Sequence, residues 1–226
     1  DRAVRGALVV VFVAGLAFAV GWAVAWLSLN HPWGWIIEFL GLIALLAGRG
    51  LYDYVRAVAT ALKRGVEPGR DAVRHIVGRD PASMDGPRVA RAALESLAEN
   101  FCDSVVAPVF WYVLFGFPGL LVSKTVNTMD SMIGHMTPQY RAFGMTAARL
   151  DDVLNLIPAR LAGLFLVFAA LFVPTANPPG ALRAMLRDAR FHRSVNAGWP
   201  EGAMAGALGL AFAGPRYYSG GMVNAP

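Results

Sequence analysis

Long apolar runs alternate with short polar stretches along the chain. The run from Ala7 to Leu29 has 23 residues and no charge, enough to cross about 30 Å of hydrocarbon at about 1.5 Å per residue. We predict a transmembrane helix there. The next run, Trp33 to Ala47, contains one carboxylate, Glu38, and we expect it to return the chain to the side it came from. Two apolar runs therefore predict two membrane segments at the start of the chain.

The segment from Gly48 to Ser104 carries nine Lys or Arg residues. Basic loops are typical of the cytoplasmic side of a membrane, so we expect this segment in the cytoplasm. Within it, Leu51 to Leu62 has the spacing of an amphipathic helix, whereas Gly65 to Asp71 has the composition of a turn and cap. After Gly48, we predict no further membrane crossing that begins before Val105.

A second helical pattern begins near Pro87 and continues to Phe115, where Gly116-Phe117-Pro118-Gly119 follows. Gly and Pro at that point end the helix and turn the chain. Helical spacing resumes after the turn, which predicts a hairpin of two antiparallel helices. The later apolar run from Leu161 to Val173 is too short to span alone, so its helix either begins near Thr146 or dips into the membrane without crossing.

The predicted fold is therefore all-α, a polytopic integral membrane helical bundle whose hairpin turns at Gly116 to Gly119. We expect a single membrane-embedded domain over residues 1–226, and we expect that one or both native ends are missing. Its parts are a cytoplasmic loop and helix (48–104), the helical hairpin (87–134), a kinked helix (145–173) and C-terminal amphipathic and small-residue helices (181–214).

Composition supports a membrane protein. Of the 226 residues, 56% are hydrophobic and 15% charged, whereas soluble domains carry about 25% charge. A single cysteine, Cys102, excludes a disulfide scaffold, and we expect it to be a small buried hydrophobic residue. The net charge is +5, and the only lysines are Lys63 and Lys124. Arginine, which suits bidentate contact with carboxylates and phosphates, supplies the remaining basic side chains.

Carboxylates recur on both predicted hairpin helices. Counted from Phe117, Asp103 lies 14 residues before the turn and Asp130 lies 13 after it, so we expect these two to face each other. Glu95, Glu99 and Asp103 form one stripe beside Asn100, and a second face carries Lys124, Asn127, Asp130 and Ser131. Facing carboxylates repel each other unless a cation lies between them, and Mg²⁺ suits such ligands. For Glu95 alone, a solvated surface position is an equal alternative.

A third polar group precedes the last apolar run. Arg149, Asp152 and Asn155 are spaced three residues apart, Asp151 reaches Asn155 at i+4, and Pro158 precedes Arg160. An ion pair within the helix explains part of this pattern. It does not explain the paired acids, the asparagine and the predicted proline kink together, so we predict a second polar cluster at the membrane edge.

Farther on, Gly198, Gly202 and Gly206 form a small-residue face that favours close helix packing and leaves open a homo-oligomer through the same face. We expect the nearby Glu201 to be buried or to face the site. The chain has no G-x-x-x-x-G-K-[ST] loop, and its histidines lack zinc spacing. Nucleotide chemistry would therefore need an unconventional site.

Five motifs resemble one known family in their order. They are GRD at Gly78 to Asp80, RAALESLAENFCDSVVAPVFW, NTMDSMIGH, ARLDDVLNLIPAR, and HRSVNAGWPEGAMAGALG with GPRYYSGG. Over roughly residues 40–221 the chain resembles the adenosylcobinamide-phosphate synthase family (CbiB/CobD), membrane proteins of cobalamin biosynthesis. The departures, which are Met129, His135, Cys102, Ser104 and Val195, remove no carboxylate.

The resemblance implies an ATP-dependent acid–amine ligase that joins adenosylcobyric acid to (R)-1-amino-2-propanol phosphate or a close analogue, with Mg²⁺. The hypothesis gives catalytic roles to Glu95, Asp103, Asp130 and Asp152. It assigns metal binding to Glu95, Glu99, Asp103, Asp130, Asp151 and Asp152. Contacts to ATP or its phosphates are expected from Arg79, Lys124, Arg149, Arg160, Asn100, Asn127 and Asn155.

Two alternatives stay open at the level of sequence. One is a Mg²⁺-dependent membrane prenyltransferase, which would need no ATP, and the other is a non-catalytic regulatory relative. In the ligase interpretation the partners are the corrinoid, the amino-alcohol phosphate and membrane lipid, with no nucleic acid. We expect a multi-pass protein of the cell membrane with its active face toward the cytoplasm.

Overall fold

The computed structural model describes residues 2–77, 80–135, 137, 140–212, 216–218 and 221–223. The chain divides into two compact units. The first unit comprises residues 1–47 and 103–158, and the second comprises residues 48–102 and 159–226. The expected single domain over the whole chain stays a prediction.

The described part of the chain is mainly helical, as predicted, and its strands are two short antiparallel ones, β1 (Arg216–Tyr218) and β2 (Gly221–Val223). Among the described residues, four helical stretches are long and apolar enough to cross a membrane: Arg2–Asn30, Gly34–Leu62, Gly86–Ile133 and Met145–Ala170. The second and third overlap residues 48–104, so the cytoplasmic position of that segment stays a prediction. The polytopic membrane fold expected from the apolar runs is confirmed.

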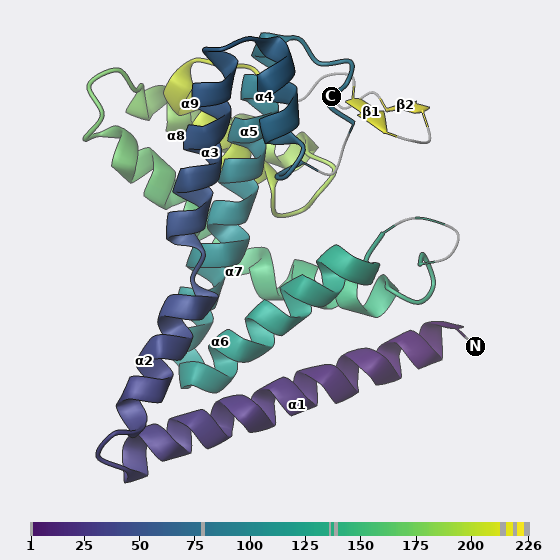
Figure 1. The fold of residues 1–226 in the computed structure, drawn as a ribbon, viewed down its shortest axis with the longest axis vertical. Coiled ribbons are helices and arrows are strands. Elements are labelled where there is room, and N and C mark those ends of the chain that lie inside the picture. Colours follow the sequence, from purple (N-terminus) through teal and green to yellow (C-terminus); the bar gives the residue numbers. More distant parts are fainter. Residues whose placement is uncertain are drawn as a thin grey trace. The chain divides into compact units, whose positions relative to one another are not determined.

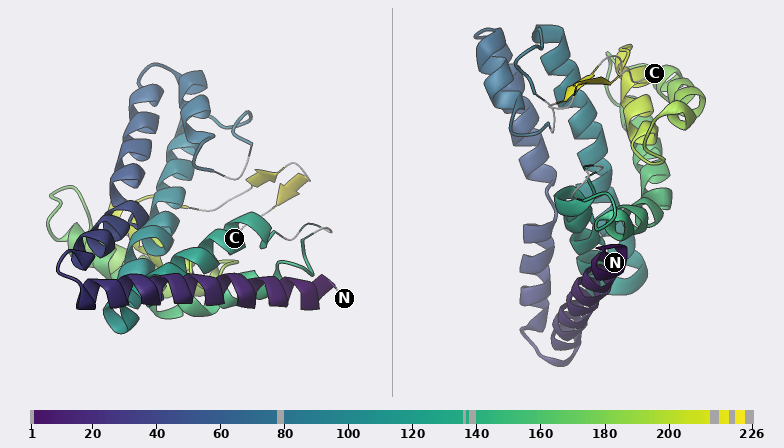
Figure 2. Two further views of the ribbon diagram at one scale, coloured as in Figure 1. Left: turned by 60° about the horizontal axis from the view of Figure 1, so that its bottom comes forward. Right: turned by 90° about the vertical axis from the view of Figure 1, so that its right-hand side faces the viewer.

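In the first unit, α1 (Arg2–Asn30) packs along the second part of α6 (Ala107–Ile133), and both run side by side in two views (Figures 1 and 2). Their core combines Val10 of α1 with Val126 and Met129 of α6 and with Ala147 of α7 (Met145–Ala170). α2 (Gly34–Leu45) follows α1. The helices predicted for residues 7–29 and 33–47, and the start of a helix near Thr146, are thereby confirmed.

The predicted turn at Gly116 is present. The backbone at Gly116 has φ 65° and ψ −158°, a conformation that essentially only glycine adopts. Beyond it the chain folds back closely, so that a Cβ at Gly119 would strike the carbonyl oxygen of Trp111. We name residues 107–115 of α6 the first arm and residues 117–133 the second arm. Figure 1 shows the second arm leaving the turn toward the end of α1 that carries the N-terminus.

The helix before the turn is nearly continuous. α5 (Gly86–Phe101) starts at the N-cap Asp85, whose side chain accepts a hydrogen bond from the backbone N–H of Arg88. Pro87 lies in the first turn, where its missing N–H costs nothing. A π-helical turn, Cys102–Val106, joins α5 to α6. Cys102 is 2% exposed, as expected of a buried small residue.

In the second unit, α3 (Gly48–Leu62) and α4 (Val66–Val73) pack with α5 around Val58, Val73 and Val89. The amphipathic helix predicted at Leu51 to Leu62 is confirmed. The prediction of a turn over Gly65 to Asp71 was wrong, because α4 occupies most of it. Pro68 lies in the first turn of α4, where backbone N–H groups have no helical acceptor, so the N–H that proline lacks is not needed.

The small-residue face of α9 (Gly198–Leu208) packs closely on α8 (Pro178–Asp188), and a 3₁₀ turn, Ala189–Phe191, follows α8. A Cβ at Gly202 would come within 3.1 Å of the Met185 Cα, and one at Gly206 would strike the Gly180 carbonyl. The close packing predicted for these glycines is confirmed within the chain. An oligomeric contact through the same face stays a prediction.

Gly116→Ala tests the turn. An alanine side chain is strained at this backbone conformation, at a cost of about 1–3 kcal/mol, so we expect a lower thermal unfolding midpoint for the detergent-solubilised protein. The matched control is Gly15→Ala, because Gly15 lies within α1 with nothing within 4 Å of an added Cβ. Equal midpoints for Gly116→Ala and Gly15→Ala would contradict a turn that depends on glycine.

Candidate functional site

A cluster of polar side chains lies where the second arm of α6 meets the start of α7, within the first unit. We name it the α6–α7 cluster; its members are Asn127, Asp130, Asp151, Asp152 and Asn155. The Nδ2 of Asn155 donates to Oδ2 of Asp151 at 2.9 Å. The Nδ2 of Asn127 makes a longer contact of 3.5 Å with the other oxygen, Oδ1. Two amides thus approach the two oxygens of Asp151 from two helices.

The carboxylates of this cluster interact electrostatically with one another. Asp151 lies within electrostatic range of Asp130 and Asp152, and Asp130 also interacts with Asp152 and with His135. All three carboxylates are partly buried, and Asn155 is 4% exposed. Like charges held this close in a poorly hydrated position repel each other. A bound cation would relieve that repulsion.

The position of the Asp130 carboxylate depends on Gly134. A Cβ at residue 134 would strike Oδ1 of Asp130, so the carboxylate lies over the glycine Cα. The backbone N–H of Gly134 donates to the Asp130 carbonyl at 2.7 Å. A residue without a side chain at the end of α6 therefore leaves space for Asp130.

A metal centre built from protein ligands alone is not found in the part of the chain that the structure describes. No group of three or more His, Cys, Asp or Glu side chains there is arranged to hold a metal ion. The assignment of metal binding to the six carboxylates stays a prediction. The α6–α7 cluster instead suits an ion that takes one or two carboxylates and completes its shell with water and phosphate oxygens, which is the usual arrangement for Mg²⁺.

A second charged pair belongs to the same unit. Lys124 of the second arm lies within electrostatic range of Asp103, which precedes the first arm. These residues are 21 positions apart in sequence, so the interaction depends on the reversal at Gly116. The structure brings Asp103 near Lys124 and Asp130 near α7. The predicted facing of Asp103 and Asp130 stays a prediction.

The remaining predicted residues of α5 lie in the second unit. Glu95 is 5% exposed, whereas Glu99 is exposed. Asn100 donates to the carbonyl of Ser96 at 2.9 Å and to its hydroxyl at 3.2 Å, and that hydroxyl donates to the Ile76 carbonyl at 2.6 Å. The Ser96 hydroxyl thereby holds the segment that follows α4, and Asn100 donates to that hydroxyl from within α5.

Arg160 also belongs to the second unit. Its guanidinium stacks 4.6 Å from the centre of the Trp199 ring and donates to Oδ1 of Asn196 at 3.3 Å. Sequence reasoning did not select Asn196 or Trp199, although both stand in the HRSVNAGW motif and that motif was the available signal. Arg149, on α7 within the first unit, is exposed.

Glu201 is buried, at 6% exposure, with Nε2 of His192 3.6 Å from its carboxylate. The backbone N–H of Ser194 donates to Nδ1 of His192 at 3.0 Å. The expectation that Glu201 is buried is confirmed.

Outside the membrane-spanning stretches, the side-chain hydrogen bond from Arg187 lowers the pKa of Asp188. Arg187 and Asp188 form a surface ion pair and are not part of a site.

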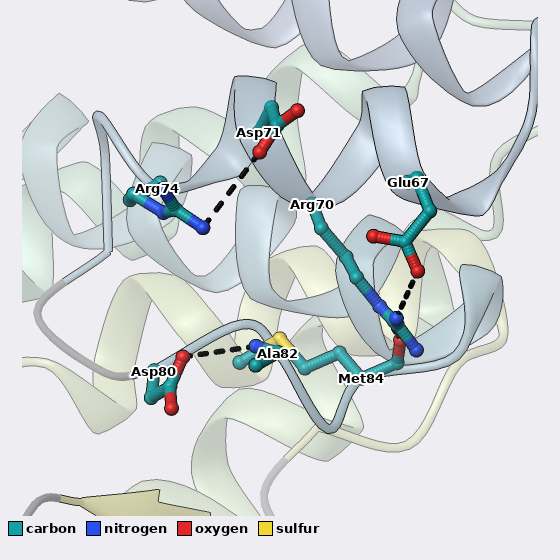
Figure 3. Close-up of polar contacts among 7 residues, drawn as sticks. All are labelled: Glu67, Arg70, Asp71, Arg74, Asp80, Ala82 and Met84. Carbon is teal, nitrogen blue, oxygen red and sulfur yellow. Dashed lines mark hydrogen bonds and ion pairs between the residues drawn. The ribbon is translucent and has the colours of Figure 1, made fainter.

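Arg79 of the GRD motif lies outside the described residues. Its neighbour Asp80 accepts a hydrogen bond from the backbone N–H of Ala82 at 3.0 Å, and Arg70 of α4 donates to the Met84 carbonyl at 2.6 Å (Figure 3). Arg70 also pairs with Glu67. The contact of Arg70 with the Met84 carbonyl fastens the segment between α4 and α5 onto α4.

Comparison with known proteins gives a consistent result. The family model described as CobD/Cbib protein matches residues 1–226. A protein of Rhodobacter capsulatus named cobalamin biosynthesis protein CobD is 50% identical over 227 residues, which cover all of this chain and 70% of the relative. Its namesake in Brucella suis is 55% identical over 196 residues, covering 85% of this chain and 60% of the relative. No solved structure matches.

The two asparagines of the α6–α7 cluster should contribute unequally to stability. Asn155→Leu, similar in volume, removes a 2.9 Å donor to a carboxylate, at a cost of about 1.5–3 kcal/mol. Asn127→Leu removes a longer contact and should lower the thermal midpoint less. In an Asp151→Leu background, which has no side-chain acceptor, the Asn155→Leu loss should shrink. Equal losses in both backgrounds would show that the donor to Asp151 is not what Asn155 contributes.

Proposed function

Because this chain belongs to the CobD/CbiB family of cobalamin biosynthesis proteins, we propose that it catalyses ATP-dependent amide-bond formation. The acid is the side-chain carboxylate of a corrinoid, adenosylcobyric acid. The amine is (R)-1-amino-2-propanol phosphate or a close analogue. The product is adenosylcobinamide phosphate.

The observation that carries this proposal is the α6–α7 cluster. Asp151 is held by Asn155 and approached by Asn127, and Asp130 and Asp152 lie within electrostatic range of it. Partly buried carboxylates that lie within electrostatic range of one another, without forming a metal centre by themselves, suit a Mg²⁺–nucleotide complex better than a metal ion alone, because phosphate oxygens complete the shell. Bound Mg²⁺ would supply neutralisation of the phosphate charge.

The reaction divides into two balanced steps. A corrinoid carboxylate oxygen attacks the γ-phosphorus of ATP, the bond to ADP breaks, and an acyl phosphate forms. The neutral amine then attacks the acyl carbon, inorganic phosphate leaves, and the nitrogen loses a proton as the amide forms. The first step needs positive charge around the phosphates, and the second needs a proton acceptor near the amine.

We propose side chains for the positive charge around the phosphates, for Mg²⁺ binding and for the acceptor of the amine proton. Lys124, Arg149, Arg160 and Arg79 are proposed to contact phosphate groups, which arginine binds in a bidentate manner. Asp130, Asp151 and Asp152 are proposed to hold Mg²⁺ or to accept the amine proton. Glu95, Glu99 and Asp103 remain proposed contributors from α5 and the π-helical turn. Asn100, Asn127 and Asn155 are proposed to orient the carboxylates.

We further propose that the protein resides in the cell membrane with this cluster accessible from the cytoplasm, where ATP is available. The nine Lys and Arg residues of the segment 48–104 support that orientation. Membrane lipid would cover the exposed apolar side chains of α1, among them Phe12, Phe18 and Trp22. A homo-oligomer through the α9 glycine face remains part of the proposal.

Asp130→Asn and Asp151→Asn test the assignment, because each keeps the side-chain volume and removes one charge. Loss of a charge that holds Mg²⁺–ATP should lower kcat/KM by about 100-fold or more, corresponding to about 3 kcal/mol. Turnover is measured as adenosylcobinamide phosphate formed in detergent with ATP, Mg²⁺ and both substrates. The control is Asp53→Asn, whose carboxylate is exposed on α3 and pairs with Arg49.

Full turnover by both cluster variants would remove Asp130 and Asp151 from the chemistry. Product formation without ATP would refute the ligase assignment itself. Replacing Mg²⁺ with EDTA should abolish turnover in the unmodified protein, and adding Mg²⁺ back should restore it.

A further inference from the structure

One carbonyl in α7 has no helical donor for a chemical reason. In an α-helix the C=O of Leu154 accepts from the N–H of residue 158, and residue 158 is proline, which has none. A proline ring within a helix also crowds the carbonyl four residues before it. Pro158 is fully buried. A carbonyl left unpaired at such a position would be costly, particularly in hydrocarbon.

Trp111 supplies the missing donor. Its indole Nε1 donates to the Leu154 carbonyl at 3.1 Å, across 43 positions of sequence. Phe115 stacks on the indole, with ring centres 5.7 Å apart and planes 18° apart, and Phe110 meets its edge at 5.2 Å. Because neighbouring aromatic rings fix the plane of the indole, its N–H points in a defined direction. The first arm therefore holds α7 at one specific carbonyl.

The Leu154 carbonyl belongs to the turn of α7 that carries Asp151, the carboxylate that accepts a hydrogen bond from Asn155. Leu154 lies between Asp151 and Asn155, the pair joined at 2.9 Å. From the other side, Asn127 on the second arm contacts Asp151. The two arms that diverge at Gly116 thus approach the same turn of α7, one through an indole N–H on the backbone and the other through an amide on a carboxylate.

We propose that Trp111 is a positioning residue for the α6–α7 cluster. By donating to the carbonyl that Pro158 leaves without a helical donor, it fixes the rotation and depth of the α7 turn and thereby the place of Asp151 and Asn155. The pairing also fixes register, because a slip of α7 by one residue would present a carbonyl already engaged within the helix. The effect on turnover rests on the proposed function, whereas the Trp111–Leu154–Pro158 coupling does not.

A double-mutant cycle tests the coupling. Trp111→Phe removes the N–H and keeps an aromatic ring, whereas Pro158→Ala restores a helical donor for the Leu154 carbonyl. We expect Trp111→Phe to lower the thermal midpoint by several degrees in the unmodified background, and by less than half as much with Pro158→Ala. The control is Trp22→Phe on α1, whose side chain is 58% exposed, and it should change the midpoint little in either background.

A second readout separates positioning from general destabilisation. In turnover assays at a temperature where all variants are folded, Trp111→Phe should raise the Mg²⁺ concentration for half-maximal rate about threefold to tenfold. Pro158→Ala should restore much of that loss to the double variant. A Trp22→Phe variant should match the unmodified protein in Mg²⁺ dependence.

Equal midpoint losses for Trp111→Phe in both backgrounds would overturn the proposal, because the ring rather than the N–H would then matter. An unchanged Mg²⁺ dependence in Trp111→Phe, with the midpoint coupling present, would overturn the positioning role and leave a structural hydrogen bond. If the unmodified protein needs no ATP or Mg²⁺ for product formation, the proposed function fails instead. The midpoint cycle still decides the pairing of Trp111 with Leu154.

Discussion

The reversal of the chain at Gly116 is the constraint on which the first unit depends. Its backbone conformation is open to glycine and strained for any residue with a Cβ. The reversal brings Lys124 within electrostatic range of Asp103 and lets the second arm pack along α1. The first arm reaches α7 through Trp111, and the second reaches it through Asn127. Without the reversal, these contacts would be spread along one straight helix.

Burial of polar groups within apolar helices requires partners, and the two units provide them differently. In the first unit, carboxylates and amides of α6 and α7 meet each other, and mutual repulsion of the carboxylates favours a cation. In the second unit, Arg160 stacks on Trp199 and Glu201 lies beside His192. The chain belongs to the CobD/CbiB family of cobalamin biosynthesis proteins. The proposed use of Mg²⁺–ATP would account for a polar cluster of α6 and α7 with few protein ligands, because the nucleotide would supply further oxygens.

Much of the fold follows from the order of residues alone. Uncharged runs determine the apolar helices, and Gly and Pro at 116–119 determine the turn, because each acts through local backbone chemistry. Helical spacing also gives the i, i+4 pair of Asp151 and Asn155. Local composition misled at Gly65 to Asp71, where two glycines and a proline suggested a turn. A proline in the first turn of a helix breaks no hydrogen bond, and packing of α4 against α3 and α5 stabilises the helix.

What the sequence left undetermined is which side chains meet between helices. Asp151 and Asp152 are neighbours in the chain, yet adjacent residues point about 100° apart around a helix, and it is Asp151 that both asparagines approach. The Trp111 indole and the Leu154 carbonyl, or Arg160 and Asn196, lie too far apart in sequence for any periodic pattern to relate them. Local rules therefore determined the helices and the turn. Tertiary structure decided the partners, because the rotation of each helix is set by the surfaces packed against it.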